Sequence, residues 1–196
     1  MQSAELPLFP LSTVLFPGGP LQLSIFEPRY VDMISRCMRA GHGFGVVLID
    51  SGSETGPASF ASIGTTAEIV DWSQRRDGLL GIAAEGRQRF RVRQWHRQDD
   101  GLYVGQLDFL EAESPMSVPD EYRFLSRLLE ELMTDLGAQY AKVPRFFDDA
   151  TWVGYRLAEL LPLAAPVKQS MLEMTDARQR LDLLRPHLGE SETTLS

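Results

Sequence analysis

The feature that most constrains the fold is a change in the spacing of the apolar residues part-way along the chain. Up to about residue 110, short alternating or apolar runs are separated by turn-forming residues, which is typical of a β-barrel or β-sandwich. From about residue 118, leucines recur at steps of three and four residues, which is typical of amphipathic helices. We therefore predict an α+β chain with a β subdomain over residues 1–115, a helical subdomain over 116–188 and a flexible tail over 189–196.

Asp-Gly pairs mark the hairpins of the first part. Asp77-Gly78 and Asp100-Gly101 each lie between apolar or alternating runs, and this dipeptide favours the tight turns that join antiparallel strands. RFRVRQW (89–95) alternates, so LYVGQLDFL (102–110) can pair with it across the second turn.

One helix is expected to interrupt the strands. Pro28 suits the first position of a helix, where its missing N–H costs nothing, and Gly41 would end that helix. Cys37 falls on the apolar face and is expected to be a buried core residue, because a free cysteine is commonly buried. The apolar face consists of Tyr30, Ile34, Cys37 and Met38.

Three helices are expected in the second part of the chain. The first follows the leucine-rich run from Tyr122 to Leu136, and a loop around KVPRFFDD comes after it. The second runs from Trp152 to Leu161, and Pro162 ends it because proline cannot continue a helix. The third begins at Pro166 and continues to Leu184.

Motifs of catalysis and of cofactor binding are missing from the sequence. It contains neither the glycine-rich phosphate loop of ATPases, nor the HExxH pattern of zinc hydrolases, nor the GxSxG nucleophile motif. A single cysteine rules out a multi-cysteine zinc site, and no apolar run approaches the ~20 residues that span a bilayer. The start of the chain also lacks a signal-peptide pattern. We expect a cytoplasmic protein with no cofactor, no metal, no membrane partner and no catalytic residue of its own.

Alternating arginines raise the alternative of RNA binding. They would project from one side of a strand, with Phe90 and Val92 on the other side and Trp95 available for base stacking. The structural interpretation is a solvated strand face that pairs with acidic neighbours. The formal net charge of −8 favours that interpretation, because nucleic-acid binders usually carry a basic excess. The arginines are Arg87, Arg89, Arg91 and Arg93.

Four sequence landmarks, in order, resemble the Lon N-terminal (substrate-binding) domain family. The opening LPLFPLSTVLFPGGPLQLSIFEPRY is similar to the start of that family, and FGVVLID, IGTTAEI and DGLLGIAAEGRQRFRV follow. LAELLPLAAPVKQSMLEMTDARQRLDLL resembles the closing helices, so the likeness spans roughly residues 5–188. The resemblance implies a PUA-like β pseudo-barrel of about six strands with one inserted helix, followed by an α-helical bundle. It also implies recognition of unfolded or tagged polypeptides, without the ATPase and protease domains of full-length Lon.

We therefore expect a non-catalytic protein- or peptide-binding module, used in substrate recognition or as an adaptor. An extended apolar segment would bind by strand addition or by filling a pocket. The alternatives are RNA binding through the arginine strand, and a hydrolytic site that uses Lys168 or Lys142 with Ser170. The sequence indicates no particular oligomeric state. Candidate peptide-binding residues, expected to be exposed in loops, are Phe44, Phe60, Phe146 and Phe147. Residues expected to build the fold in the opening motif are Pro17, Gly18, Phe26, Glu27, Pro28, Arg29 and Tyr30.

Overall fold

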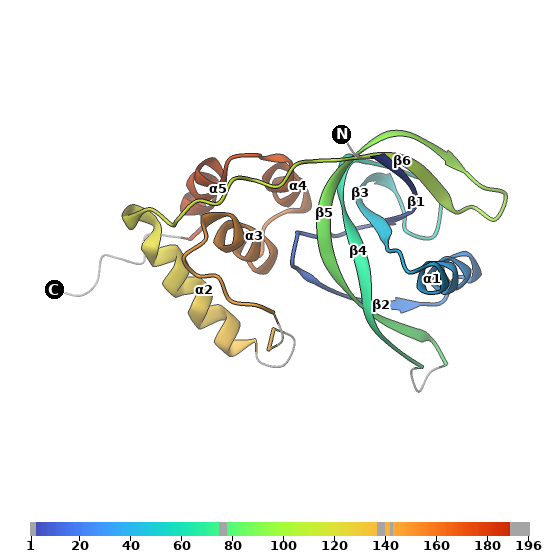
Figure 1. Cartoon of the computed structure of the whole chain (residues 1–196), viewed down its shortest axis with the longest axis horizontal. Coiled ribbons are helices and arrows are strands. Elements are labelled where there is room, and N and C mark those ends of the chain that lie inside the picture. Colours follow the sequence, from blue (N-terminus) through green and yellow to red (C-terminus); the bar gives the residue numbers. More distant parts are fainter. Residues whose placement is uncertain (1–2, 75–77, 137–139, 142, 189–196) are drawn as a thin grey trace. The chain divides into compact units, whose positions relative to one another are not determined.

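The computed structural model describes residues 3–74, 78–136, 140–141 and 143–188. The chain divides into two compact units, Met1–Ala112 and Glu113–Ser196. In its described residues the first unit is a six-stranded sheet with one helix, and the second unit is helical (Figure 1). The predicted α+β class, with a helix inserted among the strands and a helical part after them, is confirmed.

All six strands belong to one sheet, in the order β2-β5-β4-β3-β1-β6, and β5 also pairs with β6. One edge of β5 pairs with two strands, because β5 is 18 residues long: its first part pairs with β2 and its last part with β6, while β4 pairs along its other edge. The β5–β6 pairing closes β1, β3, β4, β5 and β6 into a barrel, which leaves β2 as an edge strand. The strands are β1 (Ser3–Leu11), β2 (Pro20–Ile25), β3 (Phe44–Gly52), β4 (Ala58–Gln74), β5 (Leu80–Arg97) and β6 (Tyr103–Phe109).

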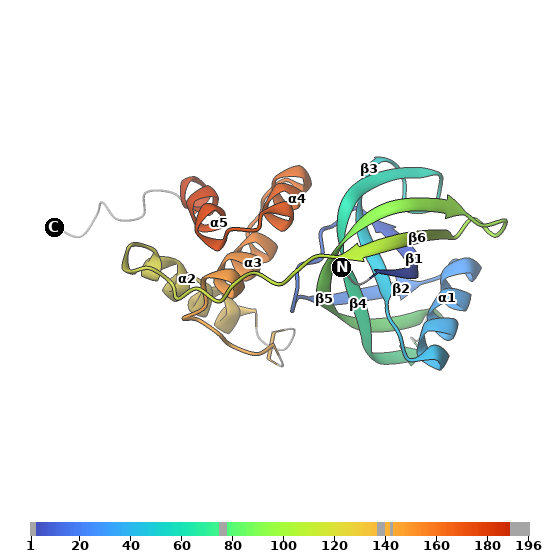
Figure 2. The ribbon, with the colours of Figure 1, turned by 45° about the horizontal axis from the view of Figure 1, so that its top comes forward.

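Helix α1 (Pro28–Ala40) connects β2 to β3 and lies beside the barrel (Figures 1 and 2). Pro28 stands in its first turn, and Gly41 ends it with φ +69°, a conformation that favours glycine. Cys37 is buried, as expected from its position on the apolar face, whereas Met38 remains 42% exposed. Tyr30 stacks on Phe9 of β1 with the ring centroids 4.0 Å apart, so the start of α1 packs against the barrel core.

The stretch before α1 turns the chain from β1 into β2. Gly18 has φ +71°, and its N–H donates to the carbonyl oxygen of Gly86 at 2.7 Å. Gly86 in turn donates to the carbonyl oxygen of Gly19 at 2.9 Å. A Cβ atom on Gly86 would lie 2.2 Å from the carbonyl oxygen of Phe16, so only glycine allows this close approach of two backbones.

Within the described residues, the first helical element of the second unit is a 3-10 turn, η1, and the last is another, η3. The prediction of a single third helix is wrong, because α4 and α5 are separate helices. Met174 adopts an extended conformation, and the Asp176 side chain accepts hydrogen bonds from the N–H groups of Arg178 and Gln179 to begin α5. The elements are η1 (Asp120–Tyr122), α2 (Arg123–Asp135), α3 (Ala150–Leu160), α4 (Ala165–Glu173), α5 (Ala177–Leu184) and η3 (Arg185–Leu188).

A buried ion pair ties the first residue of the second unit to its last helix. The Arg180 guanidinium donates to both carboxylate oxygens of Glu113, at 2.5 and 3.1 Å. It also lies over the Tyr155 ring, 4.0 Å from its centroid, and the Tyr155 hydroxyl donates to Glu113 at 2.6 Å. Because both charges are buried and hydrogen-bonded, this cluster fixes the connecting segment to the helices.

Candidate functional site

Strand β4 is longer than the strand it pairs with on the β3 side. The β3–β4 ladder ends where Phe44 pairs with Ala67, whereas β4 continues to Gln74. Residues 68–74 pair with β5 on one side, and within the described part of the chain no strand pairs with their other side. An unpaired strand edge offers a row of backbone N–H and C=O groups to an additional strand. β4 therefore carries an open pairing edge over residues 68–74.

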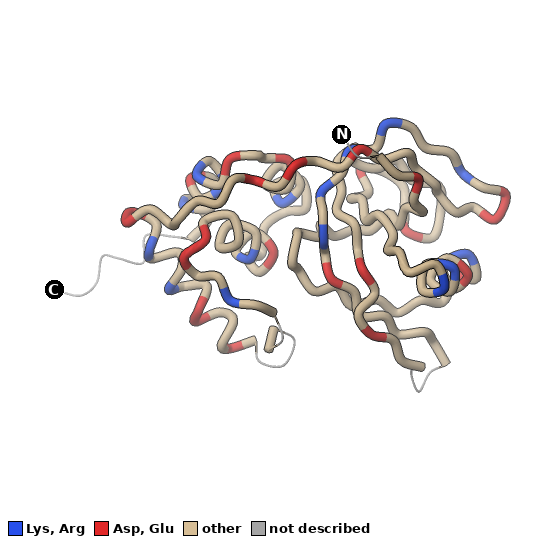
Figure 3. Tube along the Cα trace, in the orientation of Figure 1, with Lys and Arg blue, Asp and Glu red and all other residues tan. Residues whose placement is uncertain are grey.

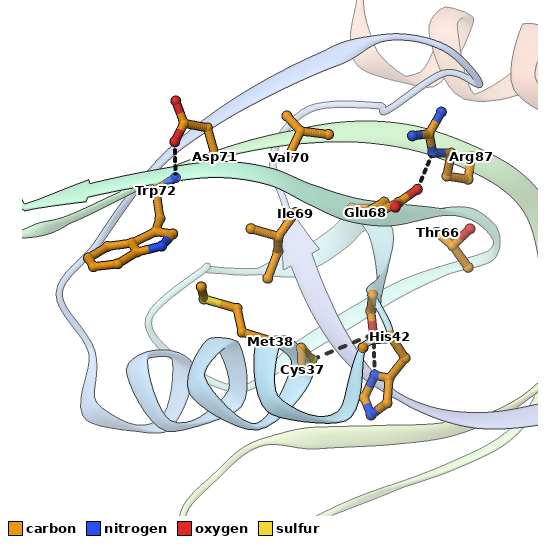
Figure 4. A pocket seen from close by; sticks show the side chains of 13 residues that line it. Cys37, Met38, His42, Thr66, Glu68, Ile69, Val70, Asp71, Trp72 and Arg87 are labelled. Atoms are coloured by element: carbon orange, nitrogen blue, oxygen red, sulfur yellow. Dashed lines mark hydrogen bonds and ion pairs between the residues drawn. The ribbon is translucent and has the colours of Figure 1, made fainter.

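A groove of about 720 Å³ lies along this edge, between β4 and the C-terminal end of α1 (Figure 4). It is lined by the end of α1 and the residues that follow it, by Thr66–Trp72 of β4 and by Arg87 of β5. A volume in this range is typical of sites that bind ligands. All of these residues belong to the first unit, so the barrel and its helix form the groove by themselves.

A β-bulge sets which side chains enter the groove. The register of β4 against β5 shifts between Ile69 and Asp71, so β4 carries an extra residue at this point. In a regular strand, side chains three positions apart lie on opposite faces. With the bulge, Ile69 and Trp72 both point toward α1, whereas Val70 and Asp71 point away from it (Figure 4).

Three apolar side chains gather at the centre of the groove. Met38 projects from α1 toward Ile69 and Trp72 of β4 (Figure 4). The Trp72 side chain is 57% exposed, which is unusual for so large an apolar group. Tryptophan contributes strongly to binding surfaces, and methionine adapts its shape to different partners. The centre of the groove can therefore bury an apolar side chain of a ligand.

At the end of α1, two side chains that line the groove contact the same backbone carbonyl oxygen. The Cys37 thiol donates to the carbonyl oxygen of Gly43 at 3.5 Å, and Nδ1 of His42 lies 2.8 Å from the same oxygen. Burial raises the pKa of the Cys37 thiol to about 11. The thiol is therefore protonated at neutral pH, and this form is a poor nucleophile.

Charged side chains border the groove and are largely paired with one another. Arg87 bonds Glu68 at 2.5 Å and Glu85 at 2.8 Å. The Asp71 carboxylate accepts a hydrogen bond from the backbone N–H of Trp72 at 2.8 Å. The border therefore carries more acidic than basic groups, and it leaves the apolar centre open.

The four phenylalanines predicted to bind peptide are divided between the two units, and the expected exposure of Phe44 is wrong. Phe44 is fully buried, because β3 begins at this residue and directs its side chain into the core beside Phe9. Phe60 is half-buried, with its ring centroid 5.3 Å from that of Trp95. These two residues belong to the first unit, and neither lines the groove.

Phe146 and Phe147 belong to the second unit, and both form edge-on ring contacts with one tryptophan. Their ring centroids are 6.1 and 5.3 Å from that of Trp152. Phe146 is 56% exposed and Phe147 is half-buried. They form a small aromatic cluster, and peptide binding at this cluster stays a prediction.

The arginines of β5 do not form the single solvated face that the alternation predicts. Arg89 is only 4% exposed, because the β4–β5 register shifts between Thr65–Ala67 and Gly86–Arg89. β5 therefore carries an extra residue here, which puts Arg89 on the opposite face from the exposed Arg87. A bulge between Val92 and Gln94 interrupts the alternation again, and Arg93 forms an ion pair with Asp108. The charged residues of β4 are acidic, whereas those of β5 are mostly arginines (Figure 3). With Arg89 buried and with Arg87 and Arg93 in ion pairs, the arginines of β5 do not form a continuous row of free cations for a phosphate backbone.

The residues considered for a hydrolytic site have backbone partners. The Lys168 ammonium donates to the carbonyl oxygen of Glu159 at 2.7 Å, and the Ser170 hydroxyl donates to that of Val167 at 2.8 Å. Lys142 lies outside the described residues. Neither described side chain bonds the other, so this geometry does not activate the serine.

Within the described ranges, no group of three or more His, Cys, Asp or Glu side chains could hold a metal ion. Among the helices that the structure describes, none is both long and apolar enough to cross a bilayer.

The sequence reasoning did not single out the residues that line the groove. Both Ile69 and Trp72 belong to the run IGTTAEIVDW (63–72), which is β-branched and only partly alternating. Their spacing was a usable signal. Two apolar residues three positions apart in a strand can share one face only if the strand contains a bulge.

Comparison with known proteins shows which family and which proteins this chain is similar to. The family model of the ATP-dependent protease La (LON) substrate-binding domain matches residues 5–190. Cereblon of Danio rerio is 35% identical over 110 residues, which cover 54% of this chain and 25% of that protein. The Lon protease of Phenylobacterium zucineum is 28% identical over 190 residues, which cover 92% of this chain and 24% of that protein. The chain thus spans about a quarter of the length of these relatives.

Solved structures agree with the family match. A Lon N-terminal domain protein from Xanthomonas campestris is 37% identical, with a TM-score of 0.79 over 93% of this chain and 98% of that one. The N-terminal domain of the Mycobacterium avium complex Lon protease has a TM-score of 0.63 at 15% identity, over 95% of this chain and 100% of that one. The second likeness concerns the fold alone.

Proposed function

The chain belongs to the ATP-dependent protease La (LON) substrate-binding domain family, and from this premise we propose that it binds extended polypeptide segments in the groove between α1 and β4. The proposal includes no catalysis by this chain, because the matched family model is that of a substrate-binding domain. Proteolysis is named only for the longer relatives.

The open edge of β4 beside an apolar groove is the observation that carries the proposal. A polypeptide added along residues 68–74 would gain backbone hydrogen bonds from the unpaired side of the strand. Such bonds do not depend on side-chain identity, which suits a module that recognises many unfolded sequences. Side chains on one face of the added strand would enter the groove beside Met38, Ile69 and Trp72.

Binding to an unfolded polypeptide tests the proposal. The probe is a fluorescein-labelled protein, unfolded permanently by reduction and carboxymethylation, and the measurement is fluorescence anisotropy. Trp72→Ala should weaken binding by roughly tenfold or more, because a central tryptophan often contributes about 2 kcal/mol or more to an interface.

Trp95 provides a matched control, since it is 51% exposed in the same unit and does not line the groove. Trp95→Ala should bind the probe as the unchanged protein does. Equal affinities for Trp72→Ala and the unchanged protein would contradict the proposed site, as would an equal loss in both variants.

Hydrogen exchange tests the mode of binding. If the polypeptide adds a strand, the exposed backbone amides within residues 68–74 should exchange more slowly in the complex, because they become hydrogen-bonded. Protection confined to other parts of the chain would contradict strand addition at this edge.

A further inference from the structure

A second pocket, of about 160 Å³, lies at the opposite end of α1 from the groove. Residues 22–27, from the edge strand β2 to the start of α1, form one side of it. Phe9 and Leu11 of β1, Tyr30 of α1, and Glu54 and Thr55 of the β3–β4 turn complete the lining. The two pockets share no lining residue. This volume is below the roughly 300 Å³ at which small-molecule sites begin, so it suits one side chain rather than a cofactor.

One part of the wall of the second pocket is apolar and partly aromatic, and polar residues complete it. Phe9 and Tyr30 are buried and stacked, which gives a fixed inner surface. Phe26 is 61% exposed and stands at the border of the pocket. Such walls suit the alkyl stem of a long side chain, and the aromatic faces also attract a cation.

Two carboxylates at the pocket are held in place by other residues. Glu27 pairs with Arg29 at 2.8 Å. One carboxylate oxygen of Glu54 accepts from both the backbone N–H and the hydroxyl of Ser12, at 2.7 and 2.6 Å. Arg29 also donates to the backbone carbonyl of Glu54 at 3.2 Å, which ties this turn to the start of α1. Fixed groups lose little freedom when a ligand binds, so the pocket is preorganised.

The charges at this pocket select the ligand. Glu27 and Glu54 together carry two negative charges, and Arg29 offsets one of them. The remaining negative charge, beside apolar walls, is complementary to a cation that carries an alkyl stem. We propose that the second pocket binds one basic side chain, a lysine or an arginine, of a polypeptide partner. The stem lies along Phe26 and Leu23, and the cationic head meets the two carboxylates. Only the identity of the partner rests on the proposed function, because a basic side chain can also be tested by itself.

NMR titration of the ¹⁵N-labelled chain with single amino-acid derivatives tests the pocket. The probes are Nα-acetyl-arginine amide and Nα-acetyl-lysine amide. Nα-acetyl-norleucine amide serves as the control, because it has a similar stem without the charge. Both basic probes should shift the amide signals of residues 22–27 and 54–55 at lower concentrations than the norleucine probe does. Equal shifts with norleucine, or shifts only elsewhere, would overturn the proposal.

A variant that removes one carboxylate shows whether electrostatic attraction, and not only the shape of the pocket, contributes to binding of the basic probe. Glu54→Gln can still accept the hydrogen bonds from Ser12 and should weaken binding of the arginine probe by about threefold, the scale of a partly exposed ion pair. Glu5→Gln removes an exposed carboxylate outside the pocket and should leave the affinity unchanged. Unchanged binding by Glu54→Gln, with the fold intact by its NMR spectrum, would overturn the role of the carboxylate.

The outcomes at the two sites are distinguishable. Failure of the amino-acid probes would remove the second pocket and leave polypeptide binding in the groove unaffected. Failure of the unfolded polypeptide with intact binding of the arginine probe would remove the proposed groove and keep the second pocket.

Discussion

The guanidinium of Arg29 donates a 2.9 Å hydrogen bond to the carbonyl oxygen of Gly101, 72 residues further along the chain. This bond joins the first turn of α1 to the β5–β6 hairpin. The same side chain bonds the carbonyl oxygen of Glu54 in the β3–β4 turn. One buried arginine thus holds two hairpin turns against the start of the helix.

Replacing Arg29 should destabilise the first unit. Arg29→Ala removes both carbonyl contacts and the ion pair with Glu27, so we expect a loss of about 3 kcal/mol in the free energy of unfolding. Chemical denaturation followed by circular dichroism measures this loss. Arg36→Ala, an exposed position on the same helix, should change the stability by less than about 0.5 kcal/mol.

The effect of Arg29 on the groove should be small, because none of its contacts reaches the groove lining. Arg29→Ala should therefore bind the unfolded polypeptide normally at temperatures where it remains folded. Loss of that binding at full folding would show that the start of α1 belongs to the binding site.

Stability should fall at alkaline pH through the Cys37 thiol. Burial raises its pKa from 9.0 to about 11, so the folded chain binds this proton more tightly than the unfolded chain. The stabilisation is fully present below pH 9 and is lost as the pH rises through about 11. A shift of this size corresponds to a free-energy change on the order of 2 kcal/mol.

Cys37→Ser provides the comparison, because serine keeps a donor for the Gly43 carbonyl and does not ionise in this range. Urea unfolding at pH 8 to 11 should show a shallower decline in stability for Cys37→Ser than for the unchanged protein. Parallel declines would show that other groups carry the alkaline sensitivity.

The second unit should depend on the pairing of Arg180 with Glu113. Arg180→Ala leaves the Glu113 carboxylate buried without its main counter-charge, which typically costs about 3–5 kcal/mol. Hydrogen exchange measured by NMR should show faster exchange at the protected amides of α2 and α3, with little change at the barrel amides, because both partners belong to the second unit.

A double variant that replaces both charged residues of the pair is the control for Arg180→Ala. Arg180→Met with Glu113→Leu should recover part of the lost stability, because apolar residues of similar size can replace a buried ion pair. A double variant as unstable as Arg180→Ala would indicate that the hydrogen bonds from Arg180 to the carbonyls of Met171 and Met174 dominate instead.

The general fold was predictable because it follows from the spacing of apolar residues and of turn-forming residues along the chain. Helical spacing located α1 and Gly41 marked its end, while Asp100-Gly101 located the β5–β6 turn, where Gly101 has φ +86°. Gly78 has φ +82°, whereas Asp77 lies outside the described residues. The tail predicted over residues 189–196 likewise lies outside them, and the predicted boundary at 115/116 stays a prediction beside the division of the structure after Ala112.

The candidate site was less predictable because it depends on strand pairing. Sequence spacing shows that residues 63–72 favour a strand, but not that β3 stops pairing at Ala67 and leaves the rest of β4 open. The same limit explains why the burial of Arg89 and Phe44 was not predicted from the sequence. Their burial follows from the extra residue of β5 between Gly86 and Arg89 and from where β3 begins, and alternation alone contains neither fact.

The bulge in β4 means that the groove does not require a fixed number of residues between Ile69 and Trp72. Deleting Val70 would remove the extra residue of the bulge, so Ile69 and Trp72 would stand two positions apart in a regular strand and would still share one face. Relatives one residue shorter in this strand could therefore keep the apolar surface formed with Met38. A position-by-position comparison that does not allow for this gap would misplace Trp72.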